Sequence, residues 1–533
     1  MKEISAQALK PLLTDGDEIA FLDVREHGQY GEGHPFFAVP LPYSRIEGLA
    51  PRLLPCRAVR CVVMDDGDGV GARAAAVLAD LGYSDVSVLA GGAPAWAAAG
   101  YTLFKGVNVP SKAFGERVEH AFETPSLSAE ELNGMQRRGE ALLLLDGRTG
   151  REFRKMALPQ ALSCPNAELG YRLPLLGADP ATPIVVNCAG RTRSIIGAQT
   201  LALLGTPNPV YALRNGTQGW RLAGFDLVHG AEPSPLPQPD PETLSAGYAL
   251  AETLRDAYAL PSVGEAQARA WLADAGATTY LFDVRSAEEY AQGHVAGARS
   301  APGGQLVQAT DEQLAVRNAR IVLACDNGLR AATTAIWLRG MGHRVWLLDS
   351  DAARTETGGA DHPPAGVADT MDLKDLKSRA DAGAQILDAS RGLDYRAGHI
   401  EGAAWVTRAR LDRLNIDDPA GLVLTGRDPA LMAGVAAELT RLTGHTPGGI
   451  LRGDPRSWRA AGLSVVETPD FPTEADCIDY LFFVHDRHDG NLDAARRYLE
   501  WELGLLDQLD DQERGVLNPL RPAAELQGRC GSC

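Results

Sequence analysis

With 533 residues and a hydrophobic fraction of 45%, the chain is long enough to form several globular domains. Its formal net charge of −18 at pH 7 argues against nucleic acid and against an anionic membrane surface as partners. The sequence contains no apolar run near the ~18 residues that a membrane span needs.

The N-terminal segment, residues 1–13, has the pattern of an amphipathic helix. It lacks the apolar stretch and the small-residue cleavage site of a secretory signal. The eight cysteines form no dense, regular framework. We therefore expect a reducing compartment, the cytoplasm, where thiols are catalytic or inert more often than paired.

Four segments of the chain repeat one pattern. Each opens with a short apolar run that ends in aspartate, at Asp23, Asp146, Asp283 and Asp388. A second apolar run follows in each segment and ends at Asp65, Cys188, Cys325 and Thr425. The interval between the two ends is 42 residues in the first three segments and 37 in the fourth. A repeat at one fixed interval indicates homologous units.

A third shared element, a glycine shortly before a tryptophan, closes three of the segments: it is Gly-x-x-x-Trp at Trp96 and Trp220 and has one residue more at Trp458. It is missing from the third segment. Apolar runs alternate with helical patterns, which is typical of βαβ units and a parallel sheet. The predicted fold class is α/β: four tandem domains, each a small parallel sheet flanked by helices, followed by a helical C-terminal tail. The predicted boundaries are 1–108, 120–230, 243–352, 368–468 and, for the tail, 469–533.

The stretch CAGRTRS, from Cys188 to Ser194, lies between an apolar run and a helical pattern. A loop that leads from a strand into a helix turns backbone N–H groups toward one point and forms an anion-binding nest. A cysteine in that nest is favoured as thiolate, the nucleophilic form. Gly190 lets the loop bend, and Arg191 and Arg193 can contact an anionic substrate. Ser194 can donate to the thiolate or cap the helix. The alternative is a buried structural cysteine beside solvated arginines.

Taken together, these motifs resemble the rhodanese superfamily of sulfurtransferases, over roughly residues 1–468. The resemblance depends on Asp-Val-Arg with a downstream Gly-His, on the Cys-x-x-x-x-Arg loop and on Gly-x-x-x-Trp. It implies that Cys188 takes up sulfane sulfur as a persulfide, with no metal and no organic cofactor. The implied donor is thiosulfate or a small persulfide, and the implied acceptor is a thiol, or cyanide in an assay. The loop from Cys188 to Arg193 has the family's six-residue form, whereas related phosphatases have one residue more.

The four copies differ at the loop. In the third copy, Cys325 and Arg330 align with Cys188 and Arg193, so Cys325 is a second candidate nucleophile, although the neighbouring Asp326 opposes its ionisation. The first copy has Asp65 and the fourth has Thr425 at the cysteine position, and neither side chain can carry sulfane sulfur. We expect both to be inactive copies with a structural or partner-binding role.

Two other motifs that recur in the copies have structural interpretations. The Asp-x-Arg elements at Asp23, Asp146 and Asp283 are expected to be ion pairs at strand ends. The Gly-His histidines His34, His294 and His399 are expected to pack.

The tail ends in Cys530-Gly-Ser-Cys533. One hypothesis makes these residues accessory thiols that accept or resolve the persulfide sulfur. The alternative is an exposed segment without such a role. The tail helix either packs on a domain or makes an oligomer contact.

Two further functions compete with sulfur transfer. One is a phosphatase or arsenate reductase, which the short loop disfavours. The other is a non-catalytic scaffold that binds a partner through rhodanese-like modules, which the two copies without cysteine keep open.

Overall fold

The computed structural model describes residues 2–349, 351–359, 366–416, 418, 420–488 and 490–522. The chain forms two compact units. The first comprises Met1–Asp15, Ile19–Val107 and Asp361–His485, and the second comprises Gly16–Glu18, Asn108–Ala360 and Asp486–Cys533. The first and fourth sequence copies therefore share one unit, and the second and third copies share the other. None of the described helices is both long and apolar enough to cross a membrane.

The sheet of the first copy has the parallel order β1-β5-β4-β2-β3. Its strands are β1 (Lys2–Ile4), β2 (Ile19–Asp23), β3 (Val39–Pro40), β4 (Arg60–Met64) and β5 (Val86–Leu89). The helices are α1 (Ala6–Leu12), α2 (His27–Glu32), α3 (Ile46–Leu53), α4 (Val70–Asp80) and α5 (Gly92–Ala98).

The predicted N-terminal helix is correct only in part. Lys2–Ile4 form β1, which pairs with β5 at the edge of the sheet. The helix begins after Ser5 because the Ser5 hydroxyl accepts a hydrogen bond from the Ala8 amide, which makes Ser5 its N-cap.

The fourth copy repeats this order without the N-terminal edge strand, as β21-β19-β22-β23. Its elements are α18 (Leu373–Asp381), β19 (Ile386–Asp388), α19 (Gly392–Arg396), β20 (His399–Ile400), β21 (Ala404–Trp405), β22 (Val423–Gly426), α20 (Pro429–Thr443), β23 (Gly449–Arg452), α21 (Pro455–Ala460), β24 (Val465–Val466) and, beyond the copy, α22 (Phe482–His485). Neighbouring residues of β19, such as Ile386 and Leu387, belong to different core clusters because successive side chains point to opposite faces. Both faces of this sheet are therefore buried.

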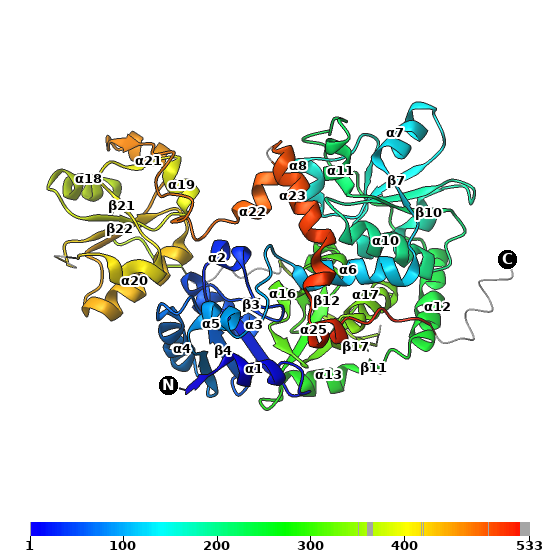
Figure 1. Cartoon of the computed structure of the whole chain (residues 1–533), viewed down its shortest axis with the longest axis horizontal. Helices are drawn as coiled ribbons and strands as arrows, with labels where there is room; N and C mark the ends of the chain where they lie inside the picture. The colour runs from blue at the N-terminus through cyan, green and yellow to red at the C-terminus, as the bar shows by residue number, and fades with distance from the viewer. Residues whose placement is uncertain are drawn as a thin grey trace. The chain divides into compact units, whose positions relative to one another are not determined.

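The second copy has the order β6-β10-β9-β7-β8, again parallel. Its elements are α6 (Val109–Phe122), β6 (Ser126–Leu127), α7 (Ala129–Arg137), β7 (Leu143–Asp146), α8 (Gly150–Lys155), β8 (Leu162–Ser163), α9 (Leu169–Arg172), β9 (Ile184–Asn187), α10 (Thr192–Leu203), β10 (Val210–Leu213) and α11 (Gly216–Leu222). Helices α6 and α10 lie side by side (Figure 1).

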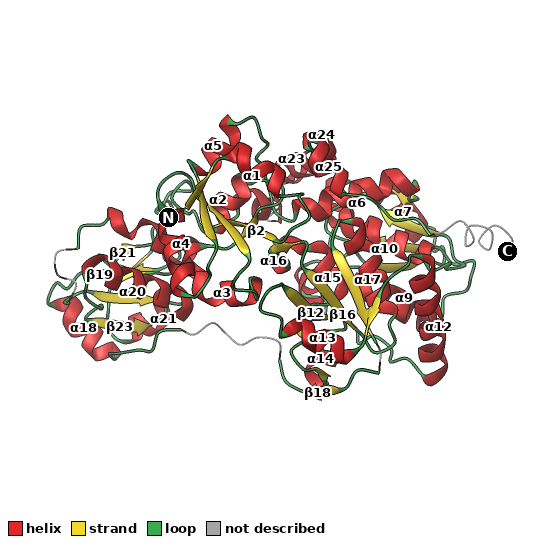
Figure 2. Ribbon diagram, turned by 90° about the horizontal axis from the view of Figure 1, so that it is seen from below, coloured by secondary structure: helices red, strands yellow, loops and turns green. Residues whose placement is uncertain are grey.

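The third copy has the matching order β11-β17-β16-β12-β14. Its elements are α12 (Pro241–Ala257), β11 (Ser262–Val263), α13 (Glu265–Leu272), β12 (Thr279–Asp283), α14 (Ala287–Gln292), β13 (His294–Val295), β14 (Arg299–Ser300), α15 (Gly303–Gln308), α16 (Thr310–Gln313), β15 (Val316–Arg317), β16 (Arg320–Ala324), α17 (Leu329–Gly340), β17 (Arg344–Leu348) and β18 (Arg354–Glu356). Helix α13 covers one face of this sheet and α15 and α17 cover the other (Figure 2). Helices α15 and α17 also contact the second copy, where Trp337 Nε1 donates to Thr200 Oγ1 at 3.0 Å.

The C-terminal segment is helical, as predicted, but it is broken into short pieces. In the second unit these are α23 (Leu492–Leu503), α24 (Leu505–Gln508) and α25 (Asp511–Val516). Helix α23 contacts α6 and α11 of the second copy, so of the two predicted placements the structure shows packing on a domain. The prediction for Cys530 and Cys533 lies outside the described residues.

Candidate functional site

Cys188 is the first residue after β9, at the carboxyl end of the second sheet, and its side chain is buried. The loop that follows enters α10 at Thr192. The neighbouring turn between β10 and α11 holds this loop, because the amides of Thr217 and Gln218 donate to the carbonyl oxygens of Cys188 and Ala189 at 2.8 and 3.1 Å. The sequence interval therefore places the cysteine where the strand, the loop and a helix N-terminus meet.

Gly216, at the start of α11, permits this close contact. It has φ +53°, and a Cβ on it would lie 2.2 Å from the Cys188 carbonyl oxygen. Gly190 does not adopt the left-handed conformation. A Cβ at Gly190 would lie 2.9 Å from Oε2 of Glu502, so the small residue permits a carboxylate to approach the loop.

Ser194 lies one turn into α10 and is fully buried. Its Oγ donates to Cys188 Sγ at 3.1 Å. Of the two predicted roles, the structure shows the contact with the sulfur, while Arg191 occupies the N-cap position of α10. A hydroxyl donor at this distance stabilises a thiolate more than a thiol.

The two loop arginines are engaged by carboxylates of the chain itself. Arg191 pairs with Glu116 at 2.7 Å and also with Glu119, both from α6. Arg193 pairs with Glu152 of α8 at 2.7 Å. Contact with an anionic substrate, as predicted from sequence, therefore requires these pairs to open or to share the guanidinium.

The loop arginines and burial together set the pKa values of the carboxyl groups that contact the loop. Burial raises the pKa of Glu116 to about 7, although Arg191 opposes the shift. Burial also opposes ionisation of Glu152, but Arg193 outweighs it and lowers the pKa of that carboxyl to about 2.

Sequence reasoning missed Glu502, which α23 brings to the Cys188 loop. Its side chain is 2% exposed, and Oε1 accepts a hydrogen bond from Thr192 Oγ1 at 3.2 Å. Oε2 has no hydrogen-bond partner among the described residues. One signal was present in the sequence: Glu502 continues the buried stripe of Ala495, Tyr498 and Leu499, where a carboxylate is unusual.

Cys325 occupies the corresponding position after β16 and is buried as well. Its Sγ donates to Asp326 Oδ1 at 3.2 Å. Burial raises the pKa of the Cys325 thiol, Arg330 lowers it and Asp326 adds to the rise, so that the pKa is about 11. Arg330 is fully buried and pairs with three carboxylates, those of Glu168, Glu289 and Asp326. The third loop therefore has the predicted residues in an environment that keeps the thiol protonated.

The first copy shows what the loop geometry does for an anion. Asp65 stands at the cysteine position and is buried. Its carboxylate accepts hydrogen bonds from the amides of Gly67, Gly69 and Gly71 at 2.9, 3.1 and 2.8 Å. The loop amides converge on this position, and in the first copy the side chain itself takes them up. In the fourth copy, Thr425 Oγ1 donates to the Leu451 carbonyl.

The predicted structural roles of the repeat motifs are confirmed. The aspartates at the strand ends form buried ion pairs with the arginine two residues on: Asp23–Arg25, Asp146–Arg148 and Asp283–Arg285, at 2.6 to 2.7 Å. The Gly-His histidines stack on a tyrosine four residues earlier, with ring centroids 3.6 to 3.8 Å apart: His34 on Tyr30, His294 on Tyr290 and His399 on Tyr395.

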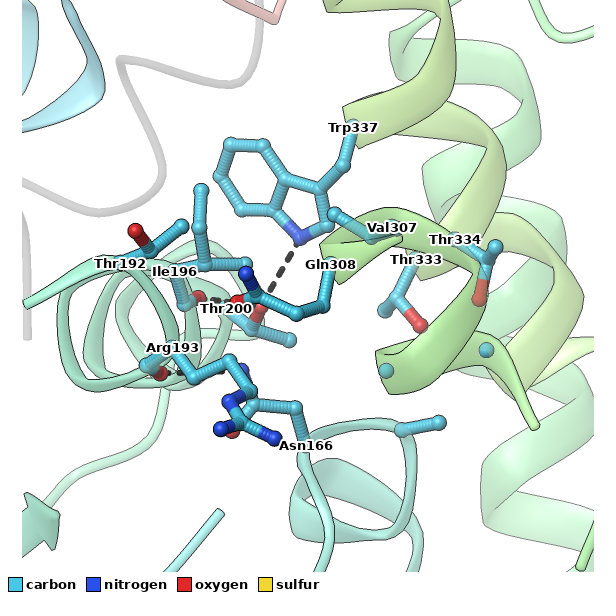
Figure 3. Close-up of a pocket in the computed structure, with 13 residues that line it drawn as sticks. Asn166, Thr192, Arg193, Ile196, Thr200, Val307, Gln308, Thr333, Thr334 and Trp337 are labelled. Carbon is cyan, nitrogen blue, oxygen red and sulfur yellow. Dashed lines mark hydrogen bonds between the residues drawn. The ribbon is translucent and has the colours of Figure 1, made fainter. Parts of the chain in front are cut away.

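Two cavities lie near the Cys188 loop. The smaller, about 20 Å³, lies between α10 and the helices α15 and α17, with Arg193 and Trp337 in its lining (Figure 3). It has room for one water molecule. The larger, about 440 Å³, lies between α11 and α23 and includes Gln218, Arg221 and Arg487. It adjoins the loop through Gln218, whose Nε2 donates to the Ala189 carbonyl at 3.1 Å.

The fold and the site define an α/β protein with a cysteine in a short loop between a parallel strand and a helix. The rhodanese-like domain model matches residues 5–99, 128–223 and 265–352. The crystal structure of thiosulfate sulfurtransferase from Pseudomonas aeruginosa is 40% identical, with a TM-score of 0.86 over 97% of this chain and 99% of that chain. The Alr3790 protein from Anabaena sp. is 30% identical, with a TM-score of 0.19, over 20% of this chain and 93% of that chain. A comparison with curated proteins gave no match. The chain belongs to the rhodanese family.

Proposed function

We propose that the chain is a sulfurtransferase in which Cys188 carries sulfane sulfur from thiosulfate or a small persulfide to a thiol, or to cyanide in an assay. One observation carries the proposal: Cys188 Sγ lies at the end of a strand, in a six-residue loop before a helix, and accepts a hydrogen bond from Ser194 Oγ at 3.1 Å. The similarity to a protein named thiosulfate sulfurtransferase, over nearly the whole chain, supports it.

The proposed reaction has two displacement steps on sulfur. In the first, the Cys188 thiolate attacks the outer sulfur of thiosulfate; the S–S bond of the donor breaks, sulfite leaves with the electron pair, and Cys188 becomes a persulfide anion. With a hydropersulfide donor, R–S–SH, the leaving group is the thiolate RS⁻ and Cys188–S–SH forms. In the second step, an acceptor thiolate attacks the outer sulfur and regenerates the Cys188 thiolate. Neither step needs an external oxidant or reductant, so we propose no metal or organic cofactor.

We propose Cys188 as the main sulfur-carrying residue and Cys325 as a weaker candidate. The Cys188 sulfur has a hydroxyl donor, whereas the Cys325 sulfur donates to a carboxylate and its pKa is raised to about 11. At neutral pH only about one Cys325 in 10⁴ is then a thiolate. We propose that Cys325 takes up sulfur far more slowly than Cys188.

We further propose that the first and fourth copies carry no sulfur. Asp65 already occupies the amide cradle of the first loop, and Thr425 offers no thiol. The fourth copy repeats the strand order of the other three, which supports its assignment as a degenerate rhodanese domain outside the family-model match. The six described cysteines are free thiols, the state that a reducing compartment such as the cytoplasm maintains.

The test is peptide mass spectrometry after brief incubation of the reduced full-length protein with thiosulfate, or with a small persulfide. We expect the mass of one sulfur atom on Cys188, and loss of cyanide-dependent turnover in C188A but not in C325A. No added sulfur on either cysteine would refute the proposal and favour the scaffold function. Hydrolysis of a phenyl phosphate that depends on Cys188 would instead favour the phosphatase.

A further inference from the structure

The carboxylate of Glu502 is built into the candidate sulfur-transfer site without a structural partner for one of its oxygens. It is buried, it is fixed on Thr192 at the N-terminus of α10, and Oε2 faces the loop at Gly190. A buried carboxylate oxygen without a hydrogen-bond donor costs free energy, so its retention needs a reason other than stability.

The charges around the loop reinforce this point. Four carboxylates surround it, those of Glu116, Glu119, Glu152 and Glu502. The cations are Arg191 and Arg193 of the loop, together with Lys112 and Arg487, which both lie over the ring of Tyr498 on α23. Four cations therefore face four carboxylates. The loop amides still attract negative charge, but the surrounding side chains add no excess of positive charge for a dianion.

The larger cavity favours a donor with an organic part. Its volume of about 440 Å³ lies beside Gln218, which is bonded to the loop carbonyl of Ala189. Thiosulfate has no group that would fill such a space. A persulfide of a small organic thiol carries at most one charge on its reacting end and can place its remainder there.

We propose that Glu502 is a specificity-determining residue that makes the Cys188 loop favour singly charged or neutral persulfide donors over dianionic thiosulfate. This inference rests on the proposed function of Cys188. Its physical basis is that the repulsion between Glu502 and the donor scales with the donor's charge, while Oε2 can accept a hydrogen bond from an S–H group.

The experiment measures kcat/KM for loading of Cys188 from thiosulfate and from the hydropersulfide of mercaptoethanol, in the wild-type protein, in E502Q and in E500Q. Glutamine keeps the shape of Glu502, removes its charge and adds N–H donors. Glu500 lies on the same helix but is exposed, so E500Q is the matched control for net charge. At an effective permittivity near 20, one unit of charge within about 10 Å changes a rate roughly tenfold. We therefore expect E502Q to raise the ratio of thiosulfate to persulfide kcat/KM at least about tenfold, and E500Q to leave it within about twofold.

Ionic strength supplies a second measurement, which needs no variant to fold. In the wild type, added salt should raise kcat/KM for dianionic thiosulfate more than for the mercaptoethanol hydropersulfide, which carries at most one charge, because salt screens the repulsion. An unchanged donor ratio in a folded E502Q that still loads Cys188 would overturn the role of Glu502 alone. An equal effect of salt on both donors would do the same. Failure of wild-type Cys188 to load from either donor would overturn the proposed function instead.

Discussion

The contact between Cys325 and Asp326 makes a measurable prediction about thiol reactivity. Burial raises the pKa of the Cys325 thiol from 9.0 to about 11, with a smaller contribution from Asp326, whose Oδ1 accepts a hydrogen bond from the thiol at 3.2 Å. A rise of two units lowers the thiolate fraction at pH 8 about 100-fold, which corresponds to about 3 kcal/mol. D326A removes the smaller cause and leaves the burial, so we expect the pKa to fall by about one unit. The variant also gives the third loop the alanine that the second loop has at Ala189.

The assay is the rate of iodoacetamide alkylation of Cys325, followed by peptide mass spectrometry between pH 7 and 11. In the wild type, the rate should rise tenfold per pH unit up to about pH 11, since only the thiolate reacts. In D326A the rise should level off about one unit earlier, and the rate at pH 8 should be about tenfold higher. D256A serves as the control, because Asp256 is exposed. A wild-type plateau at or below pH 9, or the same midpoint in D326A, would refute the reasoning.

Three further predictions concern the second copy. G216A should abolish sulfur loading of Cys188, because the new Cβ would lie 2.2 Å from the Cys188 carbonyl oxygen. G92A makes the corresponding clash, at 2.3 Å, in the first copy and should leave loading of Cys188 intact. Peptide mass spectrometry of Cys188 compares the two variants. E152Q should make the free energy of unfolding less dependent on pH in acid. The folded-state pKa of Glu152 is lowered to about 2 despite burial, because Arg193 favours the carboxylate. The stabilisation from this pair is therefore present above pH 4.5 and is lost as the pH falls toward 2. Because this carboxyl is about one-third exposed, we expect about 1–2 kcal/mol, measured by urea unfolding at pH 6 and pH 3, and equal differences at the two pH values would contradict it. W220A should destabilise the second sheet by about 3–5 kcal/mol, because the ring is buried and its Nε1 donates to a backbone carbonyl at 2.9 Å; hydrogen exchange of the β7 and β9 amides should accelerate, and unchanged exchange would rule this out.

Much of each copy's local structure follows from sequence order alone. A buried parallel strand needs apolar residues on both faces. The apolar runs of the second copy end at Asp146 and at Cys188, so the sequence could place the cysteine at a strand end. The helix predicted after that loop is α10, and the histidines of the Gly-His turns pack as expected. These features depend on contacts within a single copy, and the same sequence pattern produces them in each copy.

The tertiary structure decided what surrounds the loop. Glu116 precedes Arg191 by 75 residues and Glu502 follows Thr192 by 310, and no periodicity links them. An arginine in a sequence motif looks the same whether its guanidinium will face a substrate or two glutamates. Only the packing of the folded chain determines its partner. The grouping of the first copy with the fourth, and of the second with the third, likewise depends on contacts between copies, such as the buried hydrogen bond that Tyr43 donates to Glu438. Sequence determined the position of Cys188, the proposed nucleophile, because strand and loop geometry are local. The charge around its sulfur is set by side chains that only the folded chain brings together.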